Sequence, residues 1–335
     1  MSIEPMVKLS PAFKDYLWGG TKLRDVYNKK CALDIVAESW ELSAHPDGPS
    51  TIASGQYTGK SFIEYLDIVG KDVLGSKCKD LNEFPLLIKF IDAKQNLSVQ
   101  VHPNDEYALK YENGYGKTEM WYVIDSEEGA GLYVGFNRDV SKEEVKQRIA
   151  DNTIMDVLCF HPTKPGDIFF IPAGTVHAIG AGNLICEVQQ SSNSTYRLYD
   201  YDRQDKFGNP RELHLKKALD VLNCSKYKPV KFNGRLSCKY FEVMPLDVNG
   251  TEQIKLSDDS FYTLTCINGN GVLSLGEEMP VTKGDTIFIP ASNGNLQICG
   301  NISIILSKAQ GEENEKSVDN RNYRSGRIIS CRVSA

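Results

Sequence analysis

Two nearly identical segments decide the fold: PGDIFFIPA at residues 165–173 and, 118 residues later, KGDTIFIPA at residues 283–291. In each segment, Gly-Asp is typical of a tight turn, the apolar run is typical of a buried strand, and Pro-Ala ends that strand. A common turn and strand pattern that arose twice would also explain the two copies. The length of the match without a gap favours an internal duplication, so we expect two related β domains.

The rest of the chain supports a mainly β fold with a few added helices. Short β-prone runs are separated by Gly, Pro, Asn and Asp, and long amphipathic patterns are few. We expect helices at residues 61–69, 141–150 and 211–222. The first two begin with a serine three residues before a glutamate, which is the pattern of a helix N-cap.

Composition describes an ordinary globular protein. The 335 residues are 41% hydrophobic and carry a net charge of -6, which argues against a nucleic-acid or anionic-membrane surface. No apolar stretch approaches the roughly 18 residues that span a bilayer, and the acidic N-terminus lacks a signal-peptide pattern. The nine cysteines are scattered and mostly lie in apolar contexts, as reduced thiols do. We therefore expect a cytoplasmic protein.

Four residues form a dispersed set of candidate metal ligands: Gln100, His102, Glu119 and His177. Residues two apart in a strand point to the same face, so Gln100 and His102 can reach one point inside a barrel. Glu119 and His177 lie in or beside β-prone runs and can complete the set from other strands. Two imidazoles, a carboxylate and an amide oxygen suit zinc or another first-row divalent ion, with room for water or substrate.

Each of these residues also has a plainer interpretation, because a single histidine in a strand is more often a hydrogen-bonded core or surface residue. The other three histidines lack comparable partners, although His45 could line the mouth of a pocket. In the second copy of the repeat, Asn295 stands where the first copy has His177, and no Gln-x-His pair is found. We therefore expect the second domain to be metal-free and to serve packing or pocket closure.

Longer motifs reveal a resemblance that covers roughly residues 5–310. They are FKDYLWGG (13–20), LSVQVHP (97–103), KTEMWY (117–122), IPAGTVH (171–177) and QQSSNSTYRLYD (189–200). Together they resemble the cupin superfamily, whose domains are double-stranded β-barrels with an internal metal, and more closely type I mannose-6-phosphate isomerase in its shorter bacterial form. The resemblance implies two jelly-roll-like cupin barrels: a metal-binding catalytic domain at residues 1–225 and a metal-free one at 226–310, followed by a polar tail at 311–335.

The resemblance also implies roles for individual residues. One Zn²⁺ per chain would be bound by His102, Glu119 and His177, with Gln100 as the fourth ligand. Arg197 would be the active-site arginine. Ser98 and Lys117 match positions that bind substrate or phosphate, and Trp18 and Glu187 match pocket positions. Ile179 departs from the longer forms of the family, which carry an aromatic residue there, and this puts a hydroxyl contact from that position in doubt.

These residue types suit aldose–ketose isomerisation, which moves a proton between C1 and C2 through an enediolate whose charge needs stabilisation. Zinc and Arg197 can both stabilise that charge. The base is left open between Glu187, a water on the metal and an imidazole, with Glu187 as the first choice. Plainer alternatives are a solvated strand lysine for Lys117, a core aromatic for Trp18 and a structural ion pair for Arg197.

The predicted function is therefore interconversion of D-mannose 6-phosphate and D-fructose 6-phosphate. The expected partner is a small sugar phosphate, with no nucleic acid and no membrane, for a monomer or homodimer. Two other hypotheses remain: a different metal-dependent cupin enzyme, and a non-catalytic cupin that binds a sugar phosphate. Retention of Arg197 argues against the second.

Overall fold

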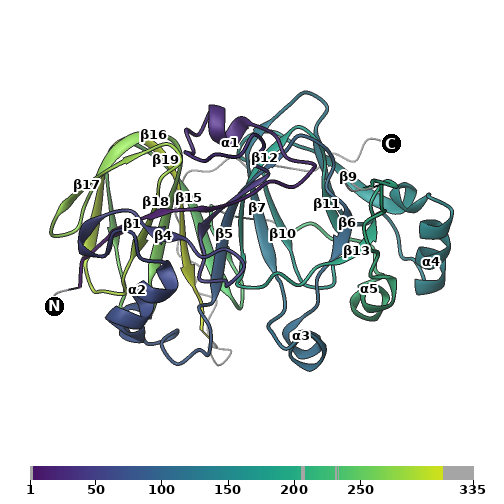
Figure 1. Cartoon of the computed structure of the whole chain (residues 1–335), viewed down its shortest axis with the longest axis horizontal. Coiled ribbons are helices and arrows are strands. Elements are labelled where there is room, and N and C mark those ends of the chain that lie inside the picture. Colours follow the sequence, from purple (N-terminus) through teal and green to yellow (C-terminus); the bar gives the residue numbers. More distant parts are fainter. Residues whose placement is uncertain (1–2, 205–207, 231, 233, 312–335) are drawn as a thin grey trace. The chain divides into compact units, whose positions relative to one another are not determined.

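The computed structural model describes residues 3–204, 208–230, 232 and 234–311, and it confirms the predicted mainly β fold with added helices (Figure 1). The chain forms two compact units. The C-terminal unit combines the described residues of Met1–Ala12, Trp40–Leu86 and Lys231–Ala335, and the central unit combines those of Phe13–Ser39 and Leu87–Val230. The units are thus discontinuous in sequence, unlike the expected domains at 1–225 and 226–310. The predicted tail lies outside the described residues beyond Gly311.

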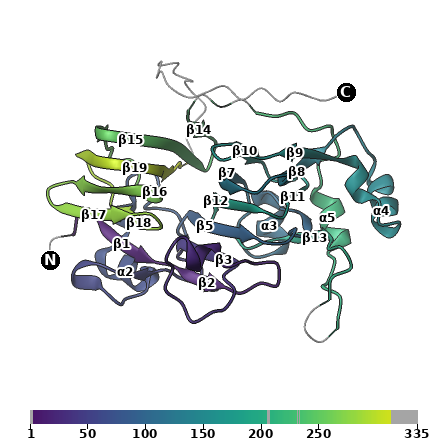
Figure 2. The same cartoon turned by 90° about the horizontal axis from the view of Figure 1, so that it is seen from above.

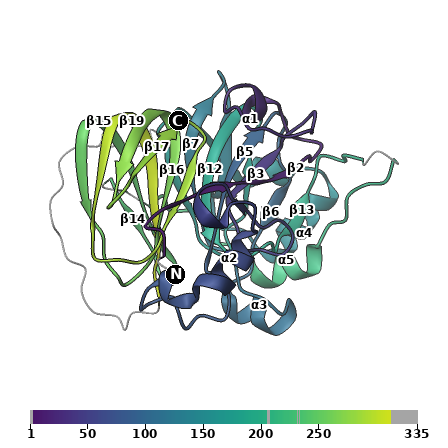
Figure 3. The ribbon, with the colours of Figure 1, turned by 60° about the vertical axis from the view of Figure 1, so that its left-hand side comes forward.

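An eight-stranded antiparallel sheet forms the C-terminal unit, with seven strands in the order β14-β15-β19-β16-β18-β1-β4 and β17 paired to β16. The strands are β1 (Val7–Ser10), β4 (Thr51–Ile52), β14 (Leu236–Ser237), β15 (Phe241–Lys255), β16 (Tyr262–Ser274), β17 (Glu278–Thr282), β18 (Thr286–Ile289) and β19 (Asn295–Ala309). Figure 3 shows the long strands β15, β16 and β19 side by side. The sheet surrounds an apolar core that includes Leu264, Ile287 and Ile298.

The N-terminal strand explains why the domain boundary differs from the predicted one. β1 pairs antiparallel with β18, with Val7 opposite Phe288 and Leu9 opposite Thr286. Val7 and Leu9 are buried, so this strand belongs to the sheet formed by the second copy of the repeat. Pairing between strands so far apart in sequence has no local signal, and a sequence read in order assigns β1 to the wrong domain.

Two antiparallel sheets form the central unit: β10-β7-β12-β5-β3-β2 and β13-β6-β11-β8-β9. The first contains β2 (Ala12–Lys14), β3 (Glu38–Leu42), β5 (Leu86–Ala93), β7 (Glu119–Ser126), β10 (Ile168–Ile171) and β12 (Asn183–Gln190). The second contains β6 (Val99–Val101), β8 (Gly131–Phe136), β9 (Leu158–Pro162), β11 (His177–Ile179) and β13 (Tyr196–Tyr199). One apolar cluster joins the sheets, for example Trp121 of the first with Val134 of the second.

Five α-helices are added to the sheets within the described residues: α1 (Lys22–Asp25), α2 (Phe62–Val69), α3 (Asp105–Tyr111), α4 (Lys142–Ala150) and α5 (Leu215–Val221). Single 3₁₀ turns lie at Gly55–Tyr57, Lys71–Leu74 and Ile154–Val157. Residues of α4 and α5 join the apolar cluster on the outer face of the five-stranded sheet, and Figure 2 shows both helices beside β13 and β9.

The predicted helices at 61–69 and 141–150 are confirmed, with Ser61 and Ser141 as N-caps. The predicted helix at 211–222 is shorter, because it begins only at Leu215. The residues before it lie along β13 instead. Arg197 Nη1 donates a hydrogen bond to the Glu212 carbonyl at 2.8 Å, and the His214 backbone N–H donates to the Arg197 carbonyl at 2.8 Å. These bonds replace the first turn of the helix.

The duplicated segments adopt the same turn. Gly166 and Gly284 both have φ of +93°, a left-handed conformation that favours glycine. In both copies an aspartate side chain closes the turn: Asp167 accepts from the Lys164 backbone N–H at 3.0 Å, and Asp285 from that of Thr282 at 2.8 Å. The strand that follows pairs antiparallel with β7 in one unit and with β16 in the other.

Of the helices that the structure describes, none is both long enough and apolar enough to cross a membrane. The eight cysteines among the described residues are free thiols.

The repeated turn can be tested with Gly166→Ala. The alanine Cβ meets no close neighbour, since the nearest atom is the Tyr122 hydroxyl at 4.0 Å, so the cost comes from the positive φ alone. We expect the free energy of unfolding to fall by about 1–2 kcal/mol. Urea denaturation followed by fluorescence measures this change. Gly114→Ala is the matched control, because Gly114 has open space and no positive φ. Equal midpoints for the two variants would contradict the strain argument.

Candidate functional site

Strand alternation builds the site on the inner face of the five-stranded sheet. Gln100 of β6 lies directly opposite His177 of β11 on one side and Arg197 of β13 on the other. Directly opposed residues point to the same face, so these three side chains form a row across the sheet. The residues on either side of Gln100 in the sequence, Val99 and Val101, face outward into the apolar cluster below α4 and α5. The same strands therefore carry core on one face and polar groups on the other.

His102, Glu119 and His177 form a buried cluster in which one ligand atom from each residue lies within 4.8 Å of the others. Glu119 Oε1 is 3.7 Å from His102 Nε2 and 3.3 Å from His177 Nε2. His102 is 1% exposed, and the other two residues are fully buried. Gln100 Nε2 lies 3.3 Å from His177 Nε2, beside the cluster. The structure thus brings together all four residues that the sequence predicts as ligands.

Hydrogen bonds on the far side of each imidazole ring orient the two histidines. His102 Nδ1 lies 2.9 Å from the Ser194 carbonyl oxygen, and His177 Nδ1 lies 2.8 Å from that of Thr175. A carbonyl oxygen only accepts, so each Nδ1 carries the proton and donates. Both Nε2 lone pairs therefore face the cluster. This is the usual arrangement of metal-binding histidines, in which the second ring nitrogen donates to a backbone carbonyl.

The cluster fits a cation. Glu119 Oε1 is buried and has no hydrogen-bond partner among the described residues. Burial raises the pKa of Glu119, but Lys117 and His177 outweigh this effect, so its pKa lies below the ordinary value. Burial, with Lys117 and His177 adding to it, holds the pKa of His102 well below its usual range, and burial also lowers the pKa of His177. An ionised carboxylate and two neutral imidazoles are the forms that bind a metal.

A chain of ion pairs continues from the cluster into the pocket. Lys117 Nζ is hydrogen-bonded to Glu119 Oε2 and lies 3.2 Å from His102 Nε2 and 3.7 Å from Glu187 Oε1. Glu187 Oε2 accepts a hydrogen bond from Trp121 Nε1 at 2.8 Å. Glu187 Oε1 also lies 3.5 Å from Lys89 Nζ. The carboxylate of Glu187 is thus fixed between an indole and two ammonium groups.

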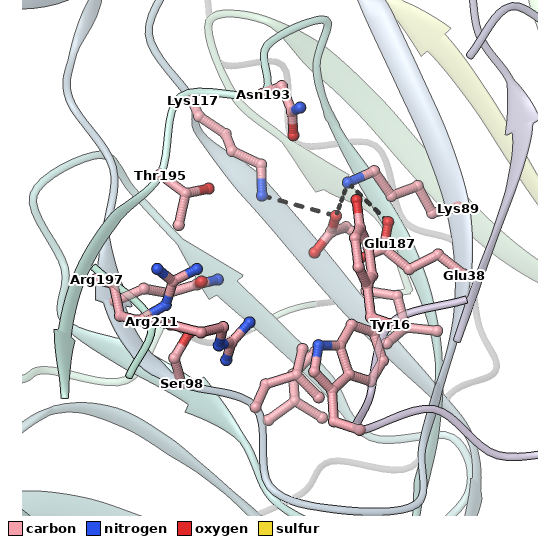
Figure 4. Close-up of a pocket in the computed structure, with 15 residues that line it drawn as sticks. Tyr16, Glu38, Lys89, Ser98, Lys117, Glu187, Asn193, Thr195, Arg197 and Arg211 are labelled. Atoms are coloured by element: carbon pink, nitrogen blue, oxygen red, sulfur yellow. Dashed lines mark ion pairs between the residues drawn. The ribbon is translucent and has the colours of Figure 1, made fainter. Parts of the chain in front are cut away.

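A pocket of about 300 Å³ opens over these groups (Figure 4). It is lined by six residues that the sequence predicts for the site, namely Trp18, Ser98, Gln100, Lys117, Glu187 and Arg197. Tyr16, Glu38, Lys89, Ile91, Leu97, Ile179, Asn193, Thr195 and Arg211 complete the lining. His102, Glu119 and His177 are not part of this lining, but Gln100 contacts His177, and Lys117 contacts His102 and Glu119.

Trp18 is 5% exposed; it belongs to the apolar core of the central unit and also lines the pocket, so both interpretations of this residue hold. Ile179 is a buried apolar wall residue, which offers no hydroxyl. His45 does not line this pocket: it belongs to the C-terminal unit, where its Nδ1 accepts from the Asp47 backbone N–H at 3.2 Å. The idea that it borders the pocket is wrong.

Three charged pocket residues escaped the sequence-based prediction: Lys89, Glu38 and Arg211. Lys89 interrupts the apolar run of β5, and a lysine within such a run is a signal that could have revealed it. Glu38 lies 3.5 Å from Lys89. Burial lowers the pKa of Lys89, but Glu38, Glu187 and Glu119 together raise it above its ordinary value. Arg211 was assigned to a helix that does not include it.

Comparisons with known proteins agree with this geometry. The family description "Phosphomannose isomerase type I, catalytic domain" matches residues 6–129, and "Mannose-6-phosphate isomerase, cupin domain" matches residues 235–309. The mannose-6-phosphate isomerase ManA of Bacillus subtilis is 38% identical over 92% of this chain and 99% of its own length. The mannose-6-phosphate isomerase of Streptococcus mutans is 37% identical over 91% of this chain and 98% of its own. A crystal structure of mannose 6-phosphate isomerase from Bacillus subtilis superposes with a TM-score of 0.83 at 38% identity and covers 91% of this chain and 99% of that one.

Two antiparallel β units with a repeated turn, one of them enclosing a His–Glu–His cluster beside a polar pocket, define a protein of the cupin class. Within that class, the chain belongs to the type I phosphomannose isomerase family. The predictions of the family, of an isomerase and of a cupin fold are thereby confirmed.

The cluster predicts metal binding by the histidines. We expect His177→Ala to lose the bound divalent ion, because it removes one of the two imidazole donors that face Glu119. Mass spectrometry of metal content after dialysis measures this, with one ion per chain expected for the unaltered protein. His45→Ala is the control, since it removes a histidine outside the cluster and should retain the ion. Equal metal content in the two variants would refute the assignment.

Proposed function

We propose that the protein interconverts D-mannose 6-phosphate and D-fructose 6-phosphate with one Zn²⁺ per chain. The observation that carries the proposal is the buried cluster of His102, Glu119 and His177 beside a pocket that also contains Glu187 and Arg197. The relatives that match nearly the whole chain bear the same activity in their names. Gln100 is the fourth ligand in this proposal, because rotating its amide by half a turn directs the oxygen at the cluster.

The donor set of two imidazoles, one carboxylate and one amide oxygen supports zinc. Gln100 lines the pocket, so the side of the cluster next to Gln100 leaves a coordination position for water or substrate. A bound Zn²⁺ would supply Lewis-acid polarisation of the C1 and C2 oxygens of the sugar. The carboxylate of Glu119 and the tautomers of His102 and His177 are fixed before binding, so the site needs little reorganisation.

Glu187 is the proposed base for proton transfer at carbon. Its carboxylate takes the proton from C2 of the open-chain aldose and returns it to C1, while the hydroxyl proton moves from O2 to O1; the product is the ketose. Trp121 fixes one carboxylate oxygen at 2.8 Å, which leaves Oε1 facing the pocket. The imidazoles are poorer candidates, because each donates through Nδ1 to a backbone carbonyl and faces Glu119 with Nε2.

Arg197 is the proposed partner of the negative charge that develops on the sugar oxygens. It lies opposite Gln100 in the sheet register, so it reaches the pocket from the strand next to the ligand-bearing one. Its Nε is buried without a hydrogen-bond partner among the described residues. Burial and the neighbouring Arg211 lower the pKa of Arg197, which indicates that an anion in the pocket would be stabilised there. The plainer alternative of a purely structural ion pair does not account for an unpaired Nε.

Lys117 and Ser98 are proposed substrate-binding residues at different places in the pocket. The ammonium group of Lys117 is engaged with Glu119 and His102, so we assign it to the sugar oxygens near the metal instead of the phosphate. Ser98 lies two residues before Gln100, on the same strand face but further from the cluster. Trp18 and Tyr16, whose rings are 5.6 Å apart, are proposed to contact the sugar carbons.

A cytoplasmic location is part of the same proposal. It is supported by the free thiols of the described cysteines, since such thiols persist in reducing compartments.

The activity is tested by a coupled assay for fructose 6-phosphate formation from mannose 6-phosphate, on zinc-loaded protein and after chelation. We expect conversion that chelation abolishes and that added zinc restores. Binding of mannose 6-phosphate without conversion at full zinc occupancy would instead indicate a sugar-phosphate-binding cupin. Conversion that survives chelation would contradict the metal assignment.

Arg197→Gln tests the stabilisation of charge. We expect kcat to fall about 10²- to 10³-fold, because a preorganised donor to the developing oxyanion is lost, while the metal content stays unchanged. Steady-state kinetics and metal analysis on one sample measure both. An unchanged kcat would show that Arg197 does not act on the developing charge.

A further inference from the structure

Arg211 is a charged residue of the pocket that the proposed mechanism leaves without a role. It lines the pocket together with Arg197 and Ser98, and Figure 4 shows the two arginines on the same side of the cavity, opposite Lys89 and Glu38. The side chain of Arg211 is 25% exposed. It reaches the pocket because residues 211–214 lie along β13 and are not helical.

Asp200 holds Arg211 in a fixed orientation. Arg211 Nε donates to Asp200 Oδ2 at 2.6 Å, and Nη2 donates to Oδ1 at 2.5 Å, which is a bidentate pair. The Asp200 side chain is only 4% exposed, so the clamp is rigid. No hydrogen bond within the described residues involves Arg211 Nη1. One edge of the guanidinium is thus fixed by the protein, and another remains for a ligand.

Positive charge exceeds negative charge at this end of the pocket. Arg203 Nη2 donates to the same Asp200 oxygen at 2.6 Å, so one carboxylate is shared by two guanidinium groups. Arg197 adds a third cation, and Arg211 acts on it as a like charge. Partly buried like charges that face one cavity are unfavourable unless an anion lies between them. The Ser98 hydroxyl offers an additional donor at the same end.

We propose that Arg211, with Ser98, forms the phosphate subsite, and that Arg211 is the residue that makes the enzyme select a phosphorylated sugar. The inference rests on the proposed function and deepens it. In and beside β6, His102, Gln100 and Ser98 share one face at two-residue spacing, so Ser98 lies further from the metal cluster than Gln100, which Arg197 faces across the sheet. The carbonyl end of the sugar is placed at the cluster and Arg197, and its phosphate dianion at Arg211 and Ser98.

Arg211→Gln on zinc-loaded protein tests the subsite. The probe is D-mannitol 1-phosphate, which keeps the phosphate but has no carbonyl and cannot be isomerised. We expect its Kd, measured by calorimetry, to rise about 10- to 100-fold, because charge-assisted hydrogen bonds to the phosphate are lost. We expect the KM for mannose 6-phosphate to rise by a similar factor while kcat changes less than about threefold, since the phosphate is bound equally in the ground and transition states.

Arg203→Gln is the matched control. Arg203 shares the Asp200 carboxylate but does not line the pocket, so its loss should change the Kd by less than about twofold. Equal weakening in Arg203→Gln and Arg211→Gln would show that only the Asp200 clamp matters, and would overturn the proposal. A Kd unchanged in Arg211→Gln, or a fall in kcat with KM unchanged, would overturn it too.

The experiment also covers a variant that does not fold and a protein that binds the phosphate without catalysing the reaction. If Arg211→Gln does not fold, Arg211→Lys keeps the charge without the bidentate clamp and should still weaken binding by about threefold or more; wild-type affinity would count against the subsite. If the protein binds mannitol 1-phosphate through Arg211 but does not convert mannose 6-phosphate, the proposed function fails and the subsite stands.

Discussion

The full burial of the Glu119 carboxylate constrains the whole interior of the central unit. A buried charge costs several kcal/mol unless it is paired. Glu119 is paired with Lys117, and it shares with two imidazoles a cluster that could hold a metal ion. The compensation continues outward: Lys117 approaches Glu187, Glu187 approaches Lys89, and Lys89 approaches Glu38. Each charge fixes the next, so the pocket wall is ordered before any substrate arrives.

Strand alternation lets this charged interior exist without loss of a hydrophobic core. On β6, Gln100 faces the pocket while Val99 and Val101 face the apolar cluster under α4 and α5. On β11, His177 faces inward and Ala178 outward. The stabilising apolar contacts therefore lie on the opposite face from the polar groups. A polar site can vary its chemistry on such a scaffold without removing the contacts that hold the sheet.

The sequence revealed those parts of the site that have a local pattern. The two-residue spacing of Gln100 and His102, and the same spacing of Lys117 and Glu119, placed each pair on one face. Relations across distant strands have no such pattern, which is why the ion pair of Lys89 with Glu187 and the pairing of β1 with β18 were missed. Arg211 was missed for a different reason. Helical propensity at residues 211–222 was correct as a local signal, but hydrogen bonds to Arg197 overrode it in the first four residues.

The hydrogen bonds that replace the first helical turn explain how Arg211, a loop residue, is held as firmly as a strand residue. A flexible arginine loses much side-chain entropy when it binds a ligand, and this loss weakens binding. Asp200 immobilises Arg211 through two hydrogen bonds, and the strand-like contacts of residues 212–214 immobilise its backbone. The entropy is lost on folding and not on binding. The rigid guanidinium then favours a multiply charged oxyanion that accepts several hydrogen bonds over a neutral hydroxyl, and selectivity for a phosphorylated sugar follows from the clamp as much as from the charge.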